Sequence, residues 1–123
     1  MLTFNLKKEW FEKIKSGEKT HEYRLQNKYW LARILNFIGL GIVRARLKKA
    51  IETGESFVFN IPPCFPYSRA CEFKCGYPKK DDKEKILQGL ITKISANIDG
   101  RNTDLNVNEP VFDIEFELIK EKL

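Results

Sequence analysis

Cysteine, histidine and long apolar stretches are scarce in this sequence. It has three Cys and one His in 123 residues, and no run approaches the roughly 18 apolar residues of a membrane-spanning helix. It also lacks a basic segment followed by an apolar run and a small-residue cleavage site. An odd number of cysteines without such a leader argues against a disulfide framework. We therefore expect a soluble, cytoplasmic protein that has no membrane contact and keeps its thiols reduced.

Motifs for metals, phosphate loops and acyl transfer are missing too. Cys64, Cys71 and Cys75 lack the tight Cys-x2-Cys spacing of structural zinc sites. The Gly-x-Gly that begins at Gly39 is followed by neither a third glycine nor Gly-Lys-Ser/Thr. The single His21 has no evident nucleophile partner. We expect no metal and no cofactor, and we expect buried thiols, with a reactive thiol as the alternative.

The composition is that of one folded domain with a basic balance. Hydrophobic residues make up 42% of the chain and aromatic residues 12%, which is ample for a single core over residues 1–123. The 22 Lys and Arg residues exceed the 17 Asp and Glu residues, giving a net charge of +5. This excess favours a polyanionic partner, although charge alone is weak evidence.

Alternating and helical spacings predict a mixed α+β chain. Alternation of apolar and polar residues predicts about five strands, and 3.6-residue spacing predicts one helix after the first strand and one or two more in the middle. The expected strands cover residues 2–6, 20–24, 57–61, 90–98 with an earlier start at 86–87, and 111–119. One expected helix lies around Trp10, a second follows an Asn27 cap and runs up to residue 38, and a third follows Gly41 and ends at residue 52.

A short segment behind the first helix concentrates charge at a turn. It reads G-x-K-x-x-E-x-R and contains Gly17, Lys19, Glu22 and Arg24; we name residues 17–24 the signature segment. A glycine just past an amphipathic helix can close it in the left-handed conformation, so the chain reverses there. In the strand that follows, Glu22 and Arg24 share a face with Thr20. We predict that Lys19, Glu22 and Arg24 converge on one concave site, where the cations keep the carboxylate charged.

A simpler interpretation of the same residues stays open. Glu and Arg two apart on a strand are most often a solvated pair that adds about 0–1 kcal/mol. In that case Glu22 and Arg24 serve no chemistry.

The first thirty residues resemble a known family. The order of strand, helix and signature segment is similar to the opening of the ASCH family of the PUA-like superfamily, and closest to its short stand-alone bacterial and phage members. The similarity includes Lys7-Lys8-Glu9-Trp10-Phe11 before the signature segment and Tyr29-Trp30 after it. The resemblance implies a small PUA-like β-barrel associated with RNA. It also implies a strand over residues 73–77, with Lys79 and Lys80 nearby, opposite the signature segment.

This resemblance implies a binding site for RNA, with DNA or a nucleoside as alternatives. Lys19 and Arg24 would hold a phosphate or a base edge, and Tyr23 and other aromatic residues would offer stacking surfaces, although each aromatic side chain is more often core. The expected ligand-binding residues are Lys8, Trp10, Gly17, Lys19, Glu22, Arg24, Trp30, Tyr77 and Lys79.

The alternative function is a small hydrolase, either a ribonuclease or a nucleoside amidohydrolase. Glu22 would be its general base, and Lys19 would stabilise the developing negative charge. Some relatives with a similar signature use a threonine nucleophile where this chain has Glu22, and Thr20 is out of register with that position. A covalent threonine mechanism is therefore not expected.

Residues 39–55 stand out as an insertion relative to the compact family pattern. They carry a basic run, which predicts either a solvated helix face or a phosphate-contacting patch. The run contains Arg44, Arg46, Lys48 and Lys49. The Asn- and Asp-rich residues 101–110 are expected to form a loop; family relatives often carry a tryptophan there, and this chain has none.

Overall fold

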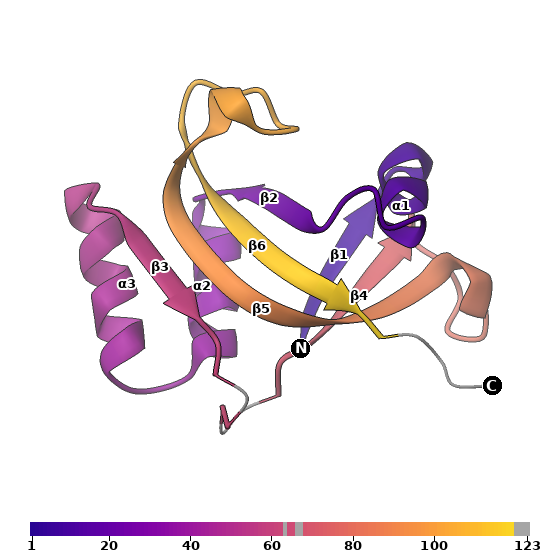
Figure 1. Cartoon of the computed structure of the whole chain (residues 1–123), viewed down its shortest axis with the longest axis horizontal. Coiled ribbons are helices and arrows are strands. Elements are labelled where there is room, and N and C mark those ends of the chain that lie inside the picture. Colours follow the sequence, from indigo (N-terminus) through magenta and orange to yellow (C-terminus); the bar gives the residue numbers. More distant parts are fainter. Residues whose placement is uncertain (63, 66–67, 120–123) are drawn as a thin grey trace.

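A curled sheet with three helices forms the protein (Figure 1). The computed structural model describes residues 1–62, 64–65 and 68–119. The helices are α1 (Lys8–Lys15), α2 (Lys28–Ile38) and α3 (Ile42–Thr53), with short 3-10 turns η1 (Lys83–Lys85) and η2 (Gly100–Asn102). The strands are β1 (Leu2–Leu6), β2 (His21–Leu25), β3 (Phe57–Asn60), β4 (Ala70–Cys75), β5 (Ile86–Asp99) and β6 (Pro110–Leu118).

The six strands form one sheet in the order β1-β4-β5-β6-β2, and β3 pairs with β5 beside this path. Only β1 and β4 are parallel; the other pairs are antiparallel. The long strand β5 carries two register shifts, which bend a strand and increase its twist. The sheet curls into a half-barrel, so the predicted α+β, barrel-like fold is confirmed, with six strands instead of about five.

The core lies inside the curl and follows the alternation of the strands. Leu2, Phe4 and Leu6 of β1 are buried, as their spacing predicts. Phe112, Ile114 and Phe116 line the same core from β6, and α1 covers it with Phe11 and Ile14. Burying each such side chain stabilises the fold by about 1.5–3 kcal/mol.

The two middle helices form a hairpin that also joins this core. Asn27 caps α2 as predicted, because its side-chain oxygen accepts a hydrogen bond from the Trp30 N–H. Gly41, at φ +128°, makes the turn into α3 in a conformation that favours glycine. Leu47 and Ala50 of α3 are buried against the sheet. The described residues contain no helix long and apolar enough to cross a membrane.

One strand that the family resemblance implied lies elsewhere in the structure. The expected strand over residues 73–77 is wrong at both ends, since β4 runs from Ala70 to Cys75. Its parallel ladder with β1 runs from the Leu2–Cys71 pair to the Leu6–Cys75 pair, and on its other side Ala70 pairs with Leu90 of β5. Tyr77 therefore lies beyond the strand and is 92% exposed.

All three cysteines are free: Cys64 is exposed, Cys71 is buried and Cys75 is partly exposed.

The buried thiol predicts a loss of stability in alkali. Burial raises the pKa of Cys71 from 9.0 to about 12. Between these values the unfolded chain loses the thiol proton and the folded chain keeps it, so the free energy of unfolding should fall by about 1.4 kcal/mol per pH unit from this group. The contribution is fully present below pH 9. Denaturant titrations from pH 8 to 11 measure the slope, and Cys71→Ala should flatten it; equal slopes would contradict the assignment.

Candidate functional site

The helix-to-strand turn delivers Lys19 back over α1. Gly17 has φ +86°, as the predicted reversal requires. The Lys19 N–H then donates to the Lys13 carbonyl oxygen at 3.0 Å. The Ser16 hydroxyl donates to that same oxygen, also at 3.0 Å. These bonds fix where the Lys19 side chain leaves the backbone.

Lys19, Glu22 and Arg24 of the signature segment lie together in ion pairs, and of these three only Lys19 also lines a neighbouring pocket. Lys19 Nζ lies 3.5 Å from one carboxylate oxygen of Glu22, and Arg24 Nη2 lies 3.2 Å from the other. The Glu22 side chain is 7% exposed. Both oxygens of this carboxylate are therefore paired with cations in a nearly dry setting, unlike a solvated surface pair.

Arg24 joins the two end strands of the curled sheet. Its guanidinium carbon lies 5.3 Å from the Phe4 ring centre and 4.8 Å from that of Trp30. Nη2 also approaches the Asn5 carbonyl oxygen of β1 at 3.5 Å. Its Nε is buried without a hydrogen-bond partner among the described residues. Arg24 thus packs as a structural bridge between β1 and β2.

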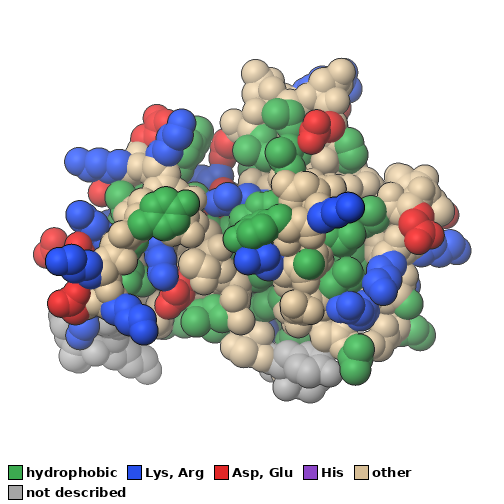
Figure 2. Space-filling model, turned by 180° about the vertical axis from the view of Figure 1, so that it is seen from behind, with side chains coloured by type: hydrophobic (Ala, Val, Ile, Leu, Met, Phe, Trp, Pro, Cys, Tyr) green, Lys and Arg blue, Asp and Glu red, His purple; other side chains and the backbone are tan. Residues whose placement is uncertain are grey.

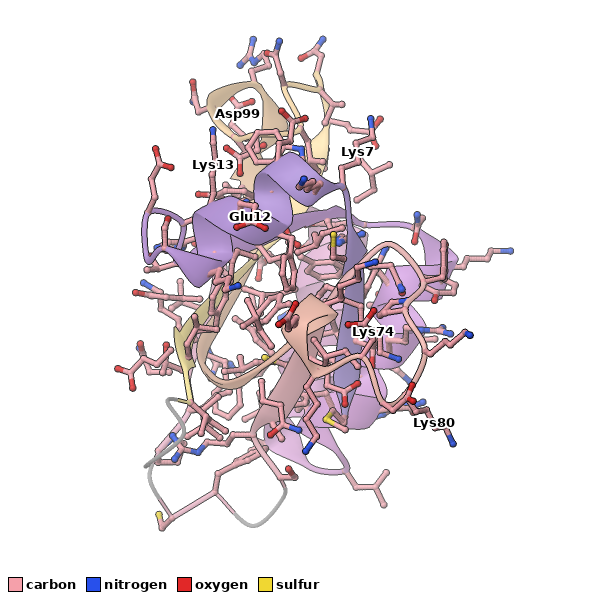
Figure 3. The ribbon with its side chains drawn as sticks, turned by 90° about the vertical axis from the view of Figure 1, so that its right-hand side faces the viewer. Lys7, Glu12, Lys13, Lys74, Lys80 and Asp99 are labelled. Carbon is pink, nitrogen blue, oxygen red and sulfur yellow. The ribbon has the colours of Figure 1, made fainter. Side chains whose placement is uncertain are left out.

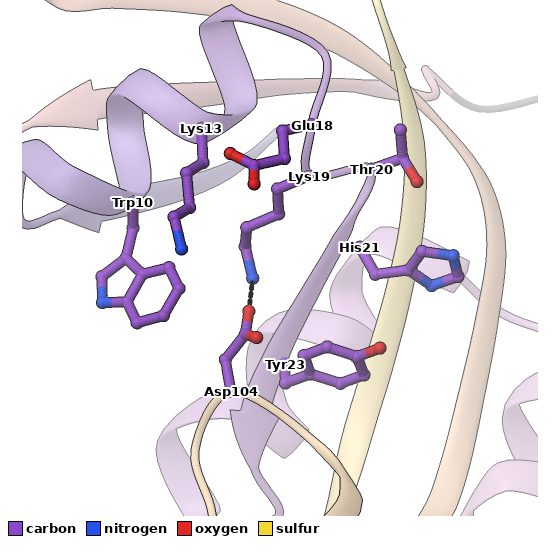
Figure 4. Close-up of a pocket in the computed structure, with 8 residues that line it drawn as sticks. All are labelled: Trp10, Lys13, Glu18, Lys19, Thr20, His21, Tyr23 and Asp104. Carbon is purple, nitrogen blue, oxygen red and sulfur yellow. Dashed lines mark hydrogen bonds and ion pairs between the residues drawn. The ribbon is translucent and has the colours of Figure 1, made fainter.

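A pocket of about 270 Å³ opens on the other side of Lys19 (Figure 4). Its wall combines α1, the signature segment and the loop after η2. The Lys19 ammonium forms an ion pair there with Asp104. The lining residues are Trp10, Lys13, Glu18, Lys19, Thr20, His21, Tyr23 and Asp104.

Aromatic rings and cations alternate along this pocket. Lys19 Nζ lies 5.4 Å from the Trp10 ring centre and 5.3 Å from that of Tyr23. Lys13 Nζ lies 4.8 Å from the Trp10 ring centre. Both distances to Lys19 are within cation–π range. Burial raises the pKa of the Tyr23 phenol above 10.0, and nearby carboxylates, with Asp113 first, raise it further, so the phenol stays neutral at pH 7.

His21 is held by acidic residues of β6 and not by a nucleophile. Its Nδ1 lies 2.8 Å from an Asp113 oxygen, and its Nε2 lies 3.8 Å from a Glu115 oxygen. Within residues 1–62, 64–65 and 68–119, Thr20 makes no hydrogen bond to His21, and no group of His, Cys, Asp and Glu side chains could hold a metal ion. The alternation predicts that Thr20 shares a strand face with Glu22. Instead, Thr20 precedes β2 and lines the pocket, whereas Glu22 is buried.

The remaining expected ligand residues lie outside the pocket wall. Trp30 is 9% exposed and stacks on Phe4 in the core, at 5.3 Å between ring centres. Lys8 is exposed on α1, and Tyr77 and Lys79 are exposed beyond β4. Glu22 and Arg24 lie behind Lys19 and do not line the pocket.

Sequence reasoning missed Asp104 and did not single out Lys13 and Glu18. Asp104 reaches Lys19 from 85 positions away in the chain, and only the η2 loop fold brings it there. Its signal was no more than an Asp in a polar loop. Lys13 could have been found, because it follows Trp10 by three positions and residues so spaced on a helix are neighbours.

No family model, curated protein or solved structure matches the chain.

Proposed function

We propose that the protein binds single-stranded RNA and holds one base in the pocket beside Trp10 and Tyr23. One observation carries this: the Lys19 ammonium lies within 5.4 Å of both ring centres at the pocket wall. Aromatic faces stack unpaired bases, and a cation beside them attracts the phosphate or an acceptor on the base. The resemblance of the first thirty residues to the ASCH family points to the same partner.

The polar groups of the pocket suit the edge of a base. Lys13 and Lys19 are hydrogen-bond donors, and Glu18 and Asp104 are acceptors. The volume of about 270 Å³ is slightly below the 300–1,000 Å³ of typical small-molecule sites, so it suits one ring system and not a folded oligonucleotide. The net charge of +5 would draw the rest of a polyanion to the surface.

The hydrolase alternative has less support. A general base must come within about 2.6–3.2 Å of the proton that it takes. Glu22 is 5% exposed, has both oxygens in ion pairs and does not line the pocket. We therefore propose binding and not hydrolysis.

Fluorescence anisotropy with labelled RNA of about 12 nucleotides tests the proposal, since single-strand binding folds cover about 4–16 nucleotides. We expect association at about 50 mM salt, with log affinity falling as log salt rises. DNA of the same sequence and a free nucleoside serve as comparison ligands. No association with RNA up to about 100 µM protein, the weak end of non-specific binding, would overturn the proposal.

Asp104 should act as a competitor for Lys19. Because the carboxylate pairs with the Lys19 ammonium, replacing Asp104 with Asn should free that cation and remove a charge that repels phosphate. We expect RNA to bind about two- to tenfold more tightly, which corresponds to about 0.4–1.4 kcal/mol of binding free energy. The matched control is Asp81→Asn, an exposed acidic residue beyond β4. Equal affinity in Asp104→Asn and wild type would contradict this role for the pair.

A further inference from the structure

The helix α3 carries four cations without acidic partners. We name Arg44, Arg46, Lys48 and Lys49 the α3 basic surface. Within the described chain none of them forms an ion pair, a property that they share with other exposed lysines such as Lys8 and Lys15. Arg46 also lies 5.9 Å from the Phe57 ring centre. Figure 2 shows blue Lys and Arg side chains on the right of that view, where the α2–α3 hairpin lies, and others on the left. Glu52 is the one acidic residue of α3, so this surface has an excess of positive charge.

The stability of α3 does not explain these charges. Arg44 and Lys48 are four positions apart, and like charges at that spacing destabilise a helix. The first turn of α3 has no acidic residue, although the positive end of the helix dipole favours one there. A sequence selected only for helix stability would place Glu or Asp at some of these positions. An external anion accounts for the pattern better.

A membrane surface fits the helix less well. Interfacial helices insert an apolar face that the protein leaves free. Leu47 and Ala50 of α3 are buried, and Val43 and Ile51 pack against the same core, so that face is already occupied. Leu40 and Ile42, at 84% and 77% exposed, offer an apolar tip only. Beyond this tip, the exposed surface of α3 is mainly charged and not apolar.

The helix is also fixed to the strand that carries the signature segment. Asn97, at φ +59° in a bulge of β5, donates through Nδ2 to the Ala50 carbonyl oxygen at 3.0 Å. Its Oδ1 accepts a hydrogen bond from Gln26 Nε2 at 2.9 Å, just past the end of β2. His21, the first residue of that strand, and Tyr23, its middle residue, line the pocket. These hydrogen bonds fix the position of α3 relative to β2, the strand whose residues line the pocket.

We propose that the α3 basic surface binds the phosphodiester backbone of a single-stranded nucleic acid whose base occupies the pocket. The proposal rests on the proposed function for the pocket end of the strand, and on charge complementarity for α3. A ligand of one nucleotide would contact the pocket alone. A longer strand would contact both surfaces, with RNA and DNA sharing the phosphate chemistry at α3.

The test compares Lys48→Gln/Lys49→Gln with Lys80→Gln/Lys83→Gln, which changes the net charge equally. Lys80 extends far from Lys13 of the pocket (Figure 3), and Lys80 and Lys83 are exposed. In Lys48→Gln/Lys49→Gln the loss of two phosphate contacts should make the decline of log affinity with log salt less steep by about 1.4. Binding of a strand of about 12 nucleotides should weaken by roughly three- to tenfold. Uridine monophosphate should bind both variants as it binds wild type.

Each outcome decides one of the two proposals. RNA affinity and salt slope equal in both double variants would overturn the α3 inference, and the pocket proposal would stand. RNA binding that needs Lys48 and Lys49 while no mononucleotide binds would support phosphate binding at α3 and overturn its link to a base in the pocket. Binding to phosphatidylserine vesicles that needs these lysines, without any RNA or DNA binding, would overturn the nucleic-acid partner. Circular dichroism of each variant verifies folding.

Discussion

Replacing Arg24 with Ala is expected to lower the free energy of unfolding by about 3 kcal/mol, as when a buried ion pair loses one partner. The change leaves the buried Glu22 carboxylate with Lys19 alone, at 3.5 Å. It also removes the guanidinium that packs beside the Phe4 ring. Because Arg24 spans the two end strands of the sheet, its loss should loosen the junction between β1 and β2. Urea denaturation followed by circular dichroism measures the difference.

The control for this prediction is an exposed pair. Lys85 lies 3.7 Å from Asp82, and both side chains are well exposed. Lys85→Ala should change the stability by no more than about 1 kcal/mol. If Arg24→Ala and Lys85→Ala cost the same, Glu22 and Arg24 are an ordinary solvated pair, and the structural role assigned to Arg24 is wrong.

Replacing Lys19 with Ala should raise the Kd for RNA by about tenfold or more, since a hydrogen bond to a charged group contributes about 1.5–3 kcal/mol. The cation beside the Trp10 and Tyr23 rings is lost. The carboxylates that it neutralised, Glu22 and Asp104, would then repel phosphate. Anisotropy titrations at equal salt measure the change.

Lys15→Ala is the matched control for Lys19→Ala. Lys15 is exposed in the last turn of α1, and among the described residues it has no ion pair. Its removal changes the net charge equally but leaves the pocket wall intact. Equal losses of affinity in the two variants would mean that RNA senses only the overall charge. Thermal unfolding of both variants shows whether they remain folded at the assay temperature.

The local elements of this fold follow directly from the sequence. The alternation of Leu2, Phe4 and Leu6 gives β1, and Asn27 marks the start of α2 because a side-chain cap is a local interaction. Gly17 gives the reversal for the same reason. The limits of β4 were not predictable in this way, because they depend on pairing with β5 and with β1, a strand about 70 positions earlier.

The site was predictable only where its residues are close in sequence. The ion pairs of Glu22 with Lys19 and Arg24 come from one turn and one strand, so spacing sufficed. Asp104 joins Lys19 through tertiary structure alone. Trp30 illustrates the opposite limit, since an aromatic residue after the signature segment can face solvent or core, and packing on Phe4 decides for the core.

The two tryptophans allow the most direct test of RNA binding in the pocket. Trp10 lines the pocket, and Trp30 is buried in the core at 9% exposed. Their indole N–H signals can be followed by NMR and assigned with Trp10→Phe and Trp30→Phe variants. We predict that uridine monophosphate, and then the longer RNA, shift the Trp10 signal while the Trp30 signal stays in place. An unmoved Trp10 signal at RNA concentrations that saturate the anisotropy change would contradict the pocket as the binding site.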